Sequence, residues 1–218
     1  MKNYILLSLW CIGILPATAQ KIIEKHITLS SKKMIAMNFQ ISDSIRIITW
    51  DKSEVYVKSS INVNDNKNND DYKMSFGEAD DNVNIAGKLE MEKGTGCSGD
   101  NGCCCCCRSK ISHEVYVPAD ADISVETING NIIISGNLAA VRAHSISGFI
   151  DLAVSPVRKA DLKLNTITGT MYSNFEFPVE EGSLRKVGGH SITTRLNGGG
   201  GKPIDLETIS GNIFLRKA

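Results

Sequence analysis

The sequence predicts an all-β protein: a single-stranded parallel β-helix, or β-solenoid, of short repeats with an N-terminal β-strand region stacked on it. Three observations predict this class. An eight-residue pattern recurs four times in the second half of the chain. The first half holds short runs of alternating apolar and polar residues, and no segment keeps the i, i+3, i+4, i+7 spacing of an amphipathic helix. Finally, 19 glycines and only 5 prolines suit short strands and tight turns.

Residues 1–19 have the features of a secretory signal peptide that is removed on export. Lys2 gives a positive start, residues 5–15 are apolar, and Ala17-Thr18-Ala19 forms a cleavage signal of small residues. The apolar run is too short to span a bilayer comfortably, and no later segment is apolar enough to do so. We therefore expect an exported protein, in the periplasm or at the cell surface, without a transmembrane segment in the mature chain.

Residues 20–118 are predicted to form the N-terminal β region. Residues 45–47 and 55–57 alternate apolar and other side chains, as half-buried strands do. Residues 62–71 are a run of Asn and Asp that predicts a surface loop. Their oxygens could hold calcium, but the spacing of a calcium loop and its closing glutamate are absent, which favours a solvated loop.

Residues 119–218 are predicted to form the solenoid repeat region. Each copy of the repeat reads apolar, polar, Thr/Ser, Ile, Asn/Ser/Thr, Gly, any residue, apolar. The four copies are residues 125–132, 143–150, 164–171 and 206–213. Their glycines are 18, 21 and 42 residues apart, and the longest interval leaves room for a degenerate copy at residues 189–196. A repeat this short cannot bury its apolar side alone, so it must stack on its neighbours.

The pattern also predicts which repeat residues form the core. The polar-Gly step asks for a sharp turn, which glycine permits, and the β-branched residues before it prefer an extended backbone. We expect the isoleucines before the turns to form one buried column, and a second column to follow the turns at Ile132, Ile150, Met171 and Ile213. The predicted structural residues are Ile128, Gly130, Ile146, Gly148, Ile167, Gly169, Ile209 and Gly211. The alternative is a two-sheet sandwich with a hairpin at each glycine, which does not explain the constant octet.

The chain resembles a bacterial family of exported β-strand-repeat proteins classed as "putative adhesins", a domain otherwise of unknown function. The likeness rests on residues 45–57, on Tyr116-Val117-Pro118, on the repeated Thr-Ile-x-Gly units and on the ending, residues 196–213. The resemblance implies a parallel β-helical module of the cell envelope. It brings no catalytic or ligand-binding residues, and the run of cysteines departs from the family pattern.

The cysteines are the one unusual constellation of reactive side chains. Six remain once the signal peptide is removed: Cys97, Cys103, Cys104, Cys105, Cys106 and Cys107. In an oxidising envelope an even number predicts disulfides, and a bridge from Cys97 across the following turn is geometrically reasonable. A soft-metal site for copper or zinc ranks second, because thiolates select these ions although the usual Cys-x-x-Cys spacing is missing. His113 is the only nearby imidazole.

The sequence predicts no catalytic site and no cofactor. Glu126 and Glu207 share a position in the octet, but we expect them to lie several coils apart, beyond the roughly 5–10 Å that paired carboxylates need. No nucleophile elbow, zinc-protease motif or phosphate-binding loop occurs. The glycine run 198–201 has no strand-to-helix context, and we expect a flexible loop there.

A non-enzymatic role follows from these observations. The near-zero net charge gives no electrostatic footprint for nucleic acid. We expect an envelope protein that binds an unidentified glycan, protein or other envelope ligand through the exposed faces of its coils. The alternatives are a self-associating structural scaffold or an accessory to envelope sensing, and, third, a soft-metal-binding protein acting through the cysteine cluster.

Overall fold

A computed structural model describes residues 20–29, 34–79, 82–90, 108–176 and 189–218. The predicted signal peptide and the six mature cysteines lie outside the described residues. The all-β prediction is confirmed: fourteen strands belong to one continuous sheet, and within the described ranges the only helix is a single 3-10 turn. The strands are β1 (Lys21–Thr28), β2 (Met34–Trp50), β3 (Glu54–Val63), β4 (Tyr72–Glu78), β5 (Asn82–Leu89), β6 (Ser109–Pro118), β7 (Asp122–Ser135), β8 (Val141–Ser147), β9 (Ile150–Val154), β10 (Ala160–Thr168), β11 (Met171–Ser173), β12 (His190–Leu196), β13 (Ile204–Ser210) and β14 (Ile213–Lys217), and the 3-10 turn is η1 (Asn69–Asp71).

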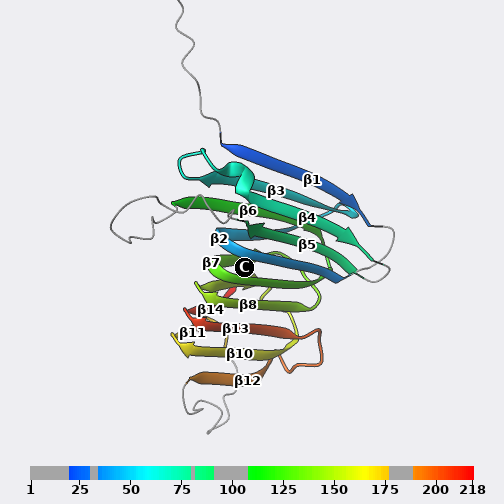
Figure 1. Cartoon of the computed structure of the whole chain (residues 1–218). Helices are drawn as coiled ribbons and strands as arrows, with labels where there is room; N and C mark the ends of the chain where they lie inside the picture. Colours follow the sequence, from blue (N-terminus) through cyan, green and yellow to red (C-terminus); the bar gives the residue numbers. More distant parts are fainter. Residues whose placement is uncertain (1–19, 30–33, 80–81, 91–107, 177–188) are drawn as a thin grey trace, which may run out of the picture.

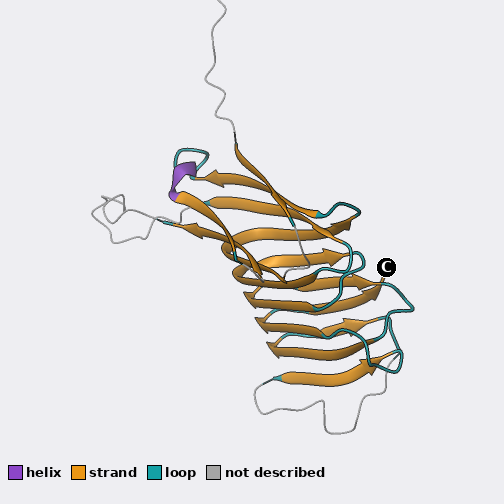
Figure 2. Cartoon of the chain, turned by 90° about the vertical axis from the view of Figure 1, so that its right-hand side faces the viewer, coloured by secondary structure: helices purple, strands orange, loops and turns teal. Residues whose placement is uncertain are grey.

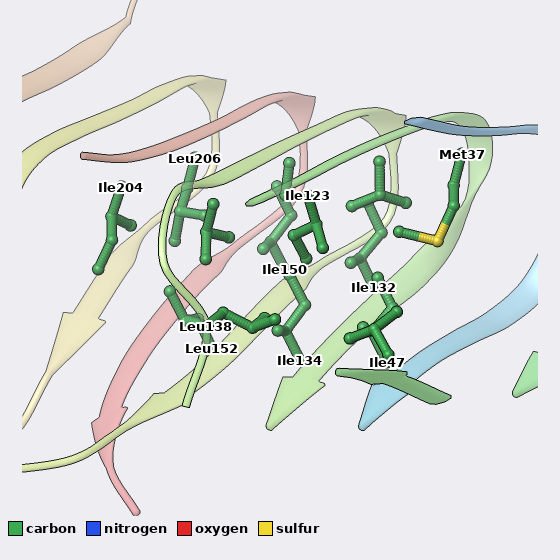
Figure 3. Close-up of a cluster of buried hydrophobic side chains, with 14 of the residues drawn as sticks. Met37, Ile47, Ile123, Ile132, Ile134, Leu138, Ile150, Leu152, Ile204 and Leu206 are labelled. Atoms are coloured by element: carbon green, nitrogen blue, oxygen red, sulfur yellow. The ribbon is translucent and has the colours of Figure 1, made fainter. Parts of the chain in front are cut away.

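The long strands β2 and β7 each bend midway, so that their two halves pair with different neighbours. The sheet therefore has two limbs. The first limb runs β4-β5-β2-β7-β8-β13-β10-β12, and the second runs β1-β3-β6-β2-β7-β9-β14-β11. The strands are stacked one above another in a ladder (Figure 2), and apolar side chains from both limbs form one buried cluster (Figure 3). The limbs thus enclose the core between them and turn their other faces to solvent.

The repeat coils pair in parallel, but not in the order of the chain. The strand β7 pairs with β8, β8 with β13, and β13 with β10. On the second limb β9 likewise pairs with β14, and β14 with β11. The last coil, residues 204–217, therefore lies between the coils at 141–154 and 160–173, and the C-terminus ends near the middle of the stack (Figure 1). Parallel pairing throughout these coils excludes a hairpin at each octet glycine.

The octet glycines form the corner between the two limbs, where neighbouring coils approach most closely. A Cβ added to Gly148 would lie 2.2 Å from the carbonyl oxygen of Gly130, and one on Gly211 would lie 2.0 Å from that of Gly148. The same step recurs from Gly169 to Gly211, at 1.9 Å. Gly148 also has a φ of 135°, which side-chain-bearing residues rarely adopt. Glycine recurs because neighbouring carbonyl groups occupy the space of a side chain.

The predicted column of buried isoleucines before the corner is wrong. Ile128, Ile146, Ile167 and Ile209 are 50, 39, 51 and 38% exposed. The alternation of side chains along each strand instead buries the octet's hydroxyl residue, one position earlier: Thr127, Ser145, Thr166 and Thr208. The second predicted column is buried at Ile132, Ile150 and Ile213, and Met171 is half-buried at the last coil.

Three of these four buried hydroxyls tie their coil to the corner of a neighbouring coil. Ser145 donates to the carbonyl of Gly130 over 3.3 Å, and Thr208 donates to that of Gly148 over 3.2 Å. Thr166 donates to the carbonyl of Gly211 over 3.0 Å. A buried hydroxyl needs such an acceptor, because an unpaired one would cost roughly 1–3 kcal/mol. The Thr/Ser position is thus a link between coils, and the isoleucine after it faces outward.

The degenerate copy does not join the parallel stack. Its strand, β12, pairs antiparallel with β10. With Thr194 in place of the corner glycine, the chain does not bend onto the second limb there. It turns back through Asn197 and Gly198–Gly200, all with φ between 49° and 86°, and Asn197 donates to the carbonyls of Pro156 and Arg158 over 2.8 and 2.7 Å. Residues 197–200, which include most of the glycine run, therefore form a left-handed turn that leads into β13.

Candidate binding faces of the sheet

The outward face of the second limb carries three rows of side chains across β3, β6 and β2. Strand register places Tyr56 beside Tyr116, and Ile48 follows on β2. We call these residues, with His26 on β1, the aromatic row. The charged row is Lys58, Glu114 and Arg46, and the serine row is Ser60, Ser112 and Ser44. Rows on one face are two residues apart, about 6.7 Å along the strands.

The aromatic row continues into Trp50 at the end of β2. The ring centroids of Tyr56 and Tyr116 are 5.8 Å apart, and that of Trp50 lies 5.4 Å from Tyr116. His26 lies 4.5 Å from Tyr56, and the ammonium of Lys52 sits 4.7 Å from the centre of the Trp50 ring. The rings of Tyr56, Tyr116 and Trp50 are half-buried. They form a continuous aromatic strip that remains in part accessible to solvent.

A groove lies beside the aromatic row, over the charged and serine rows. Its volume is about 360 Å³, and it is lined by Ser44, Arg46, Lys58, Ser60, Ser112, His113 and Glu114. Lys58 lies 3.7 Å from the carboxylate of Glu24, an exposed pair of small energetic value. Arg46 and Glu114 form no ion pair with any described residue. The groove therefore presents a guanidinium, a carboxylate and three hydroxyl side chains.

A buried polar cluster lies in the core of the N-terminal region, behind this groove. His113 is 1% exposed and stacks on Phe39 at 4.0 Å between ring centroids. Its Nδ1 is 2.8 Å from the Ser59 hydroxyl, and its Nε2 is 3.1 Å from the Tyr72 hydroxyl. Burial lowers the pKa of His113 to about 3 and raises the pKa of Tyr72, because desolvation disfavours the charged form of each. Both rings are neutral at physiological pH.

This cluster stabilises the core and is unsuited to catalysis. Ser59, Tyr72 and His113 are all buried, so a substrate cannot reach them. A Cβ on Gly87 would lie 2.1 Å from the Tyr72 hydroxyl, which shows how closely the cluster is enclosed. The sequence motifs point to His113 only as a neighbour of the cysteines. Its alternation with Ile111 and Val115 was the signal for a buried histidine.

The outward face of the first limb is polar and contains an unexpected juxtaposition. Because the last coil is inserted beside β8, register places His144 directly between Glu126 and Glu207. Our expectation that these glutamates lie several coils apart is therefore wrong: one strand separates them. In the next row Lys163 lies 3.4 Å from Asp205. Among the described residues no group of three His, Cys, Asp or Glu side chains is arranged to hold a metal ion.

A second aromatic cluster lies on the second limb within the repeat region. Phe214 stacks on Tyr172 at 5.1 Å and meets Phe149 edge-on at 5.9 Å. Arg216 forms an ion pair with Asp151 at 2.6 Å nearby. The pKa of Arg216 is raised by this contact. Unlike the aromatic row, this cluster does not border the groove.

The polar loop at residues 62–71 holds itself together. Asn64, Asp65 and Asn66 are left-handed, with φ between 51° and 66°. The side-chain oxygen of Asn69 accepts the Val63 amide at 2.8 Å, while its amide nitrogen donates to Asn66 at 3.1 Å. These internal hydrogen bonds account for the Asn-rich sequence. Calcium is not needed to explain the loop's shape.

The arrangement defines a class: an all-β strand-repeat module whose coils turn at stacked glycines. The chain belongs to the family described as Toastrack DUF4097, whose model matches residues 33–216. No helix in the described part of the chain is long and apolar enough to cross a membrane. No curated protein matches the sequence.

Two solved structures are similar to this chain at low sequence identity. A "putative cell adhesion protein" from Clostridium sporogenes is similar with a TM-score of 0.60 and 12% identity, over 92% of this chain and all of that one. A "putative adhesin" from Parabacteroides merdae matches with a TM-score of 0.30 and 10% identity, over 70% of this chain and 69% of that one. The structure from Clostridium sporogenes has the same kind of fold as this chain.

Proposed function

We propose that the protein is a non-enzymatic, exported binding module of the cell envelope, in which a two-sided β-solenoid presents a rigid binding face. The observation that carries this proposal is the aromatic row beside a polar groove on the second limb. Both sit on hydrogen-bonded strands above a filled core. Strands position side chains more precisely than loops do, which favours recognition without rearrangement.

Other features fit a binding role better than catalysis. The buried His113 is closed to a substrate, and Glu126 and Glu207 flank His144 on the outward polar face of the first limb. The solved structure from Clostridium sporogenes carries a name that refers to cell adhesion. Residues 1–19 supply the export signal in this proposal, residues 20–118 the binding face, and residues 119–218 the stack that supports it.

The test is binding of the chain from residue 20 onward to isolated cell-envelope material. We expect saturable co-sedimentation with the envelope preparation, reduced at least tenfold in affinity by the double variant Tyr116→Ala/Arg46→Ala. A matched control, Thr193→Ala, changes an exposed residue on the first limb and should bind like the wild type. Absence of saturable binding would refute the proposal, as would equal binding by the double variant.

The second candidate is a self-assembling scaffold, favoured by the position of β12. This strand ends the first limb, so its outer edge has no partner strand among the described residues. Such an edge can template pairing with another chain. Light scattering across a concentration series separates the two functions: growth of defined assemblies supports the scaffold, and a strict monomer rules it out.

A further inference from the structure

We infer that the groove over β3, β6 and β2 is an oligosaccharide-binding site: a sugar ring packs on Tyr56 and Tyr116, and its hydroxyls bind the charged and serine rows. This inference rests on the proposed function and names its ligand class. It is drawn from three adjoining features of one face. These are the half-buried aromatic strip, the groove, and charged side chains without ion-pair partners in the described chain.

The aromatic row favours a sugar over a protein partner. A sugar ring has an apolar face of C–H groups and a polar rim, so it suits an aromatic ring next to hydrogen-bonding groups. A protein interface instead needs roughly 800 Å² on each partner around an apolar centre. Here the accessible apolar surface is one row wide, because Lys58, Glu114 and Arg46 border it directly.

The polar rows match the chemistry of a sugar's rim. Arg46 offers a planar fork of donors, and Glu114 offers two acceptor oxygens. The hydroxyls of Ser44, Ser60 and Ser112 can each donate and accept. Hydroxyl groups of a sugar likewise donate and accept, so a mixed set of protein groups can satisfy them together. A lone anion would match only the cations, and Glu114 would repel it.

Polar contacts of Tyr56 and Trp50 leave the ring faces of the aromatic row available to a ligand. The pKa of Tyr56 is raised by desolvation and by the hydrogen bond to Glu24, so the phenol remains neutral. In this contact the Tyr56 hydroxyl donates, which leaves the ring as its contribution to a ligand. Trp50 likewise donates its indole N–H to the Glu54 carbonyl over 2.8 Å. These bonds fix the orientation of the rings before any ligand arrives.

The volume of the groove and the spacing of the three rows suit a short oligosaccharide. The groove's 360 Å³ lies at the lower end of the roughly 300–1,000 Å³ typical of small-ligand sites. The aromatic row lies one row spacing, about 6.7 Å, from the charged row and two from the serine row. One ring over the tyrosines therefore leaves space for a linked ring over the serines. The Phe149, Phe214 and Tyr172 cluster has similar rings but does not line this groove.

The experiment uses the chain from residue 20 onward on an array of neutral hexose, N-acetylhexosamine and uronic-acid oligosaccharides of two to six residues. The best-binding chain is then titrated by calorimetry. We expect Tyr116→Ala and Arg46→Ala each to weaken binding at least tenfold, and Tyr116→Phe, which keeps the ring, to bind within about twofold of the wild type. Tyr172→Ala is the matched aromatic control and should bind normally. Thermal unfolding checks that each variant is folded, and Ser112→Trp, which fills the groove, gives a second way to block it.

Two results would overturn the inference: no array member binds, or binding survives both Tyr116→Ala and Ser112→Trp. Envelope material oxidised with periodate, which cleaves vicinal diols of sugars, separates this inference from the proposed function. Loss of binding after oxidation supports a saccharide ligand. Retained binding overturns the saccharide while leaving the binding module intact, and failure to bind untreated envelope removes both.

Discussion

The repeat region, residues 119–218, and the N-terminal region, residues 20–118, share one sheet but fix their register by different means. In the repeat region the coils are held by backbone contacts at Gly130, Gly148 and Gly211, with hydroxyl links between neighbouring coils. In the N-terminal region antiparallel strands enclose an aromatic and polar cluster around His113. Because the same contact recurs in every coil, the repeat region has few positions at which residue types can vary to form a site. The irregular N-terminal region carries the groove.

The largest expected effect is at the glycine corner. Gly148→Ala places a Cβ against the Gly130 carbonyl at a φ of 135°, and backbone strain plus overpacking should cost about 4 kcal/mol of unfolding free energy. In the N-terminal region Gly77→Ala meets nothing nearer than the Asn84 Cβ at 3.8 Å and should stay within about 0.5 kcal/mol of the wild type. Urea unfolding measures both. Equal effects would remove the proposed difference between the two regions.

Two isoleucines of one octet should differ in their contribution to stability, because Ile146 is exposed and Ile150 is buried. Ile150→Thr replaces the ethyl branch of a buried side chain with a hydroxyl, which should lower the free energy of unfolding by about 3 kcal/mol. Ile146→Thr keeps a β-branched residue on the surface and should cost no more than about 0.5 kcal/mol. Denaturation midpoints with unchanged m-values provide the measurement. A large loss for Ile146→Thr would contradict the outward position of this isoleucine.

The buried His113 should make the stability of the N-terminal region depend on pH. The native pKa of His113 is lowered from 6.5 to about 3, so the unfolded chain binds a proton first as the pH falls. The contribution of neutral His113 is complete above about pH 6.5 and is lost between 6.5 and 3. Between pH 6.5 and 4.5 this amounts to about 2 to 3 kcal/mol.

His113→Gln tests this assignment, since it removes the titrating ring. The variant should be less stable than the wild type at pH 7, and the difference between the two proteins should shrink as the pH is lowered to 4.5. Unfolding by urea at several pH values reports both free energies. A constant difference across this range would show that His113 is not the group responsible.

The smallest predicted effect concerns the link between coils. Thr208→Val keeps the side chain's shape but removes the hydrogen bond to the Gly148 carbonyl, at a cost of about 1 kcal/mol. Thr170→Val is the matched control, because the Thr170 side chain is exposed. Its stability should match the wild type within about 0.5 kcal/mol. An equal loss in both variants would point to β-propensity rather than the buried link.

The sequence predicted the parts of the fold that depend on local pattern. Alternation identified the strands, and the octet glycines marked the corners, because a turn constrains residue type at a fixed position. The inward residues of the octet were misassigned because hydrophobicity was taken to decide burial. Thr127 is buried since its hydroxyl finds a backbone acceptor within the corner, whereas Ile128 takes the outward position that alternation imposes.

Strand order and the groove could not be predicted from the repeats. Four near-identical octets fit against one another in any order, so no pattern indicated that residues 204–217 enter between two earlier coils. The juxtaposition of Glu126, His144 and Glu207 follows from that order and was missed with it. Ser60, Ser112 and Ser44 come from three separate strands, two of them antiparallel, and only the pairing brings them together.

The inserted last coil has a consequence for how the chain acquires its structure. A chain that is synthesised with its N-terminus first can pair β7 with β8, but the position on the other side of β8 stays unpaired until β13 has been made. The coil at residues 160–173 must wait as well, because β13 supplies its parallel partner. Stacking is thus completed late, by contacts between residues far apart in sequence, which slows folding.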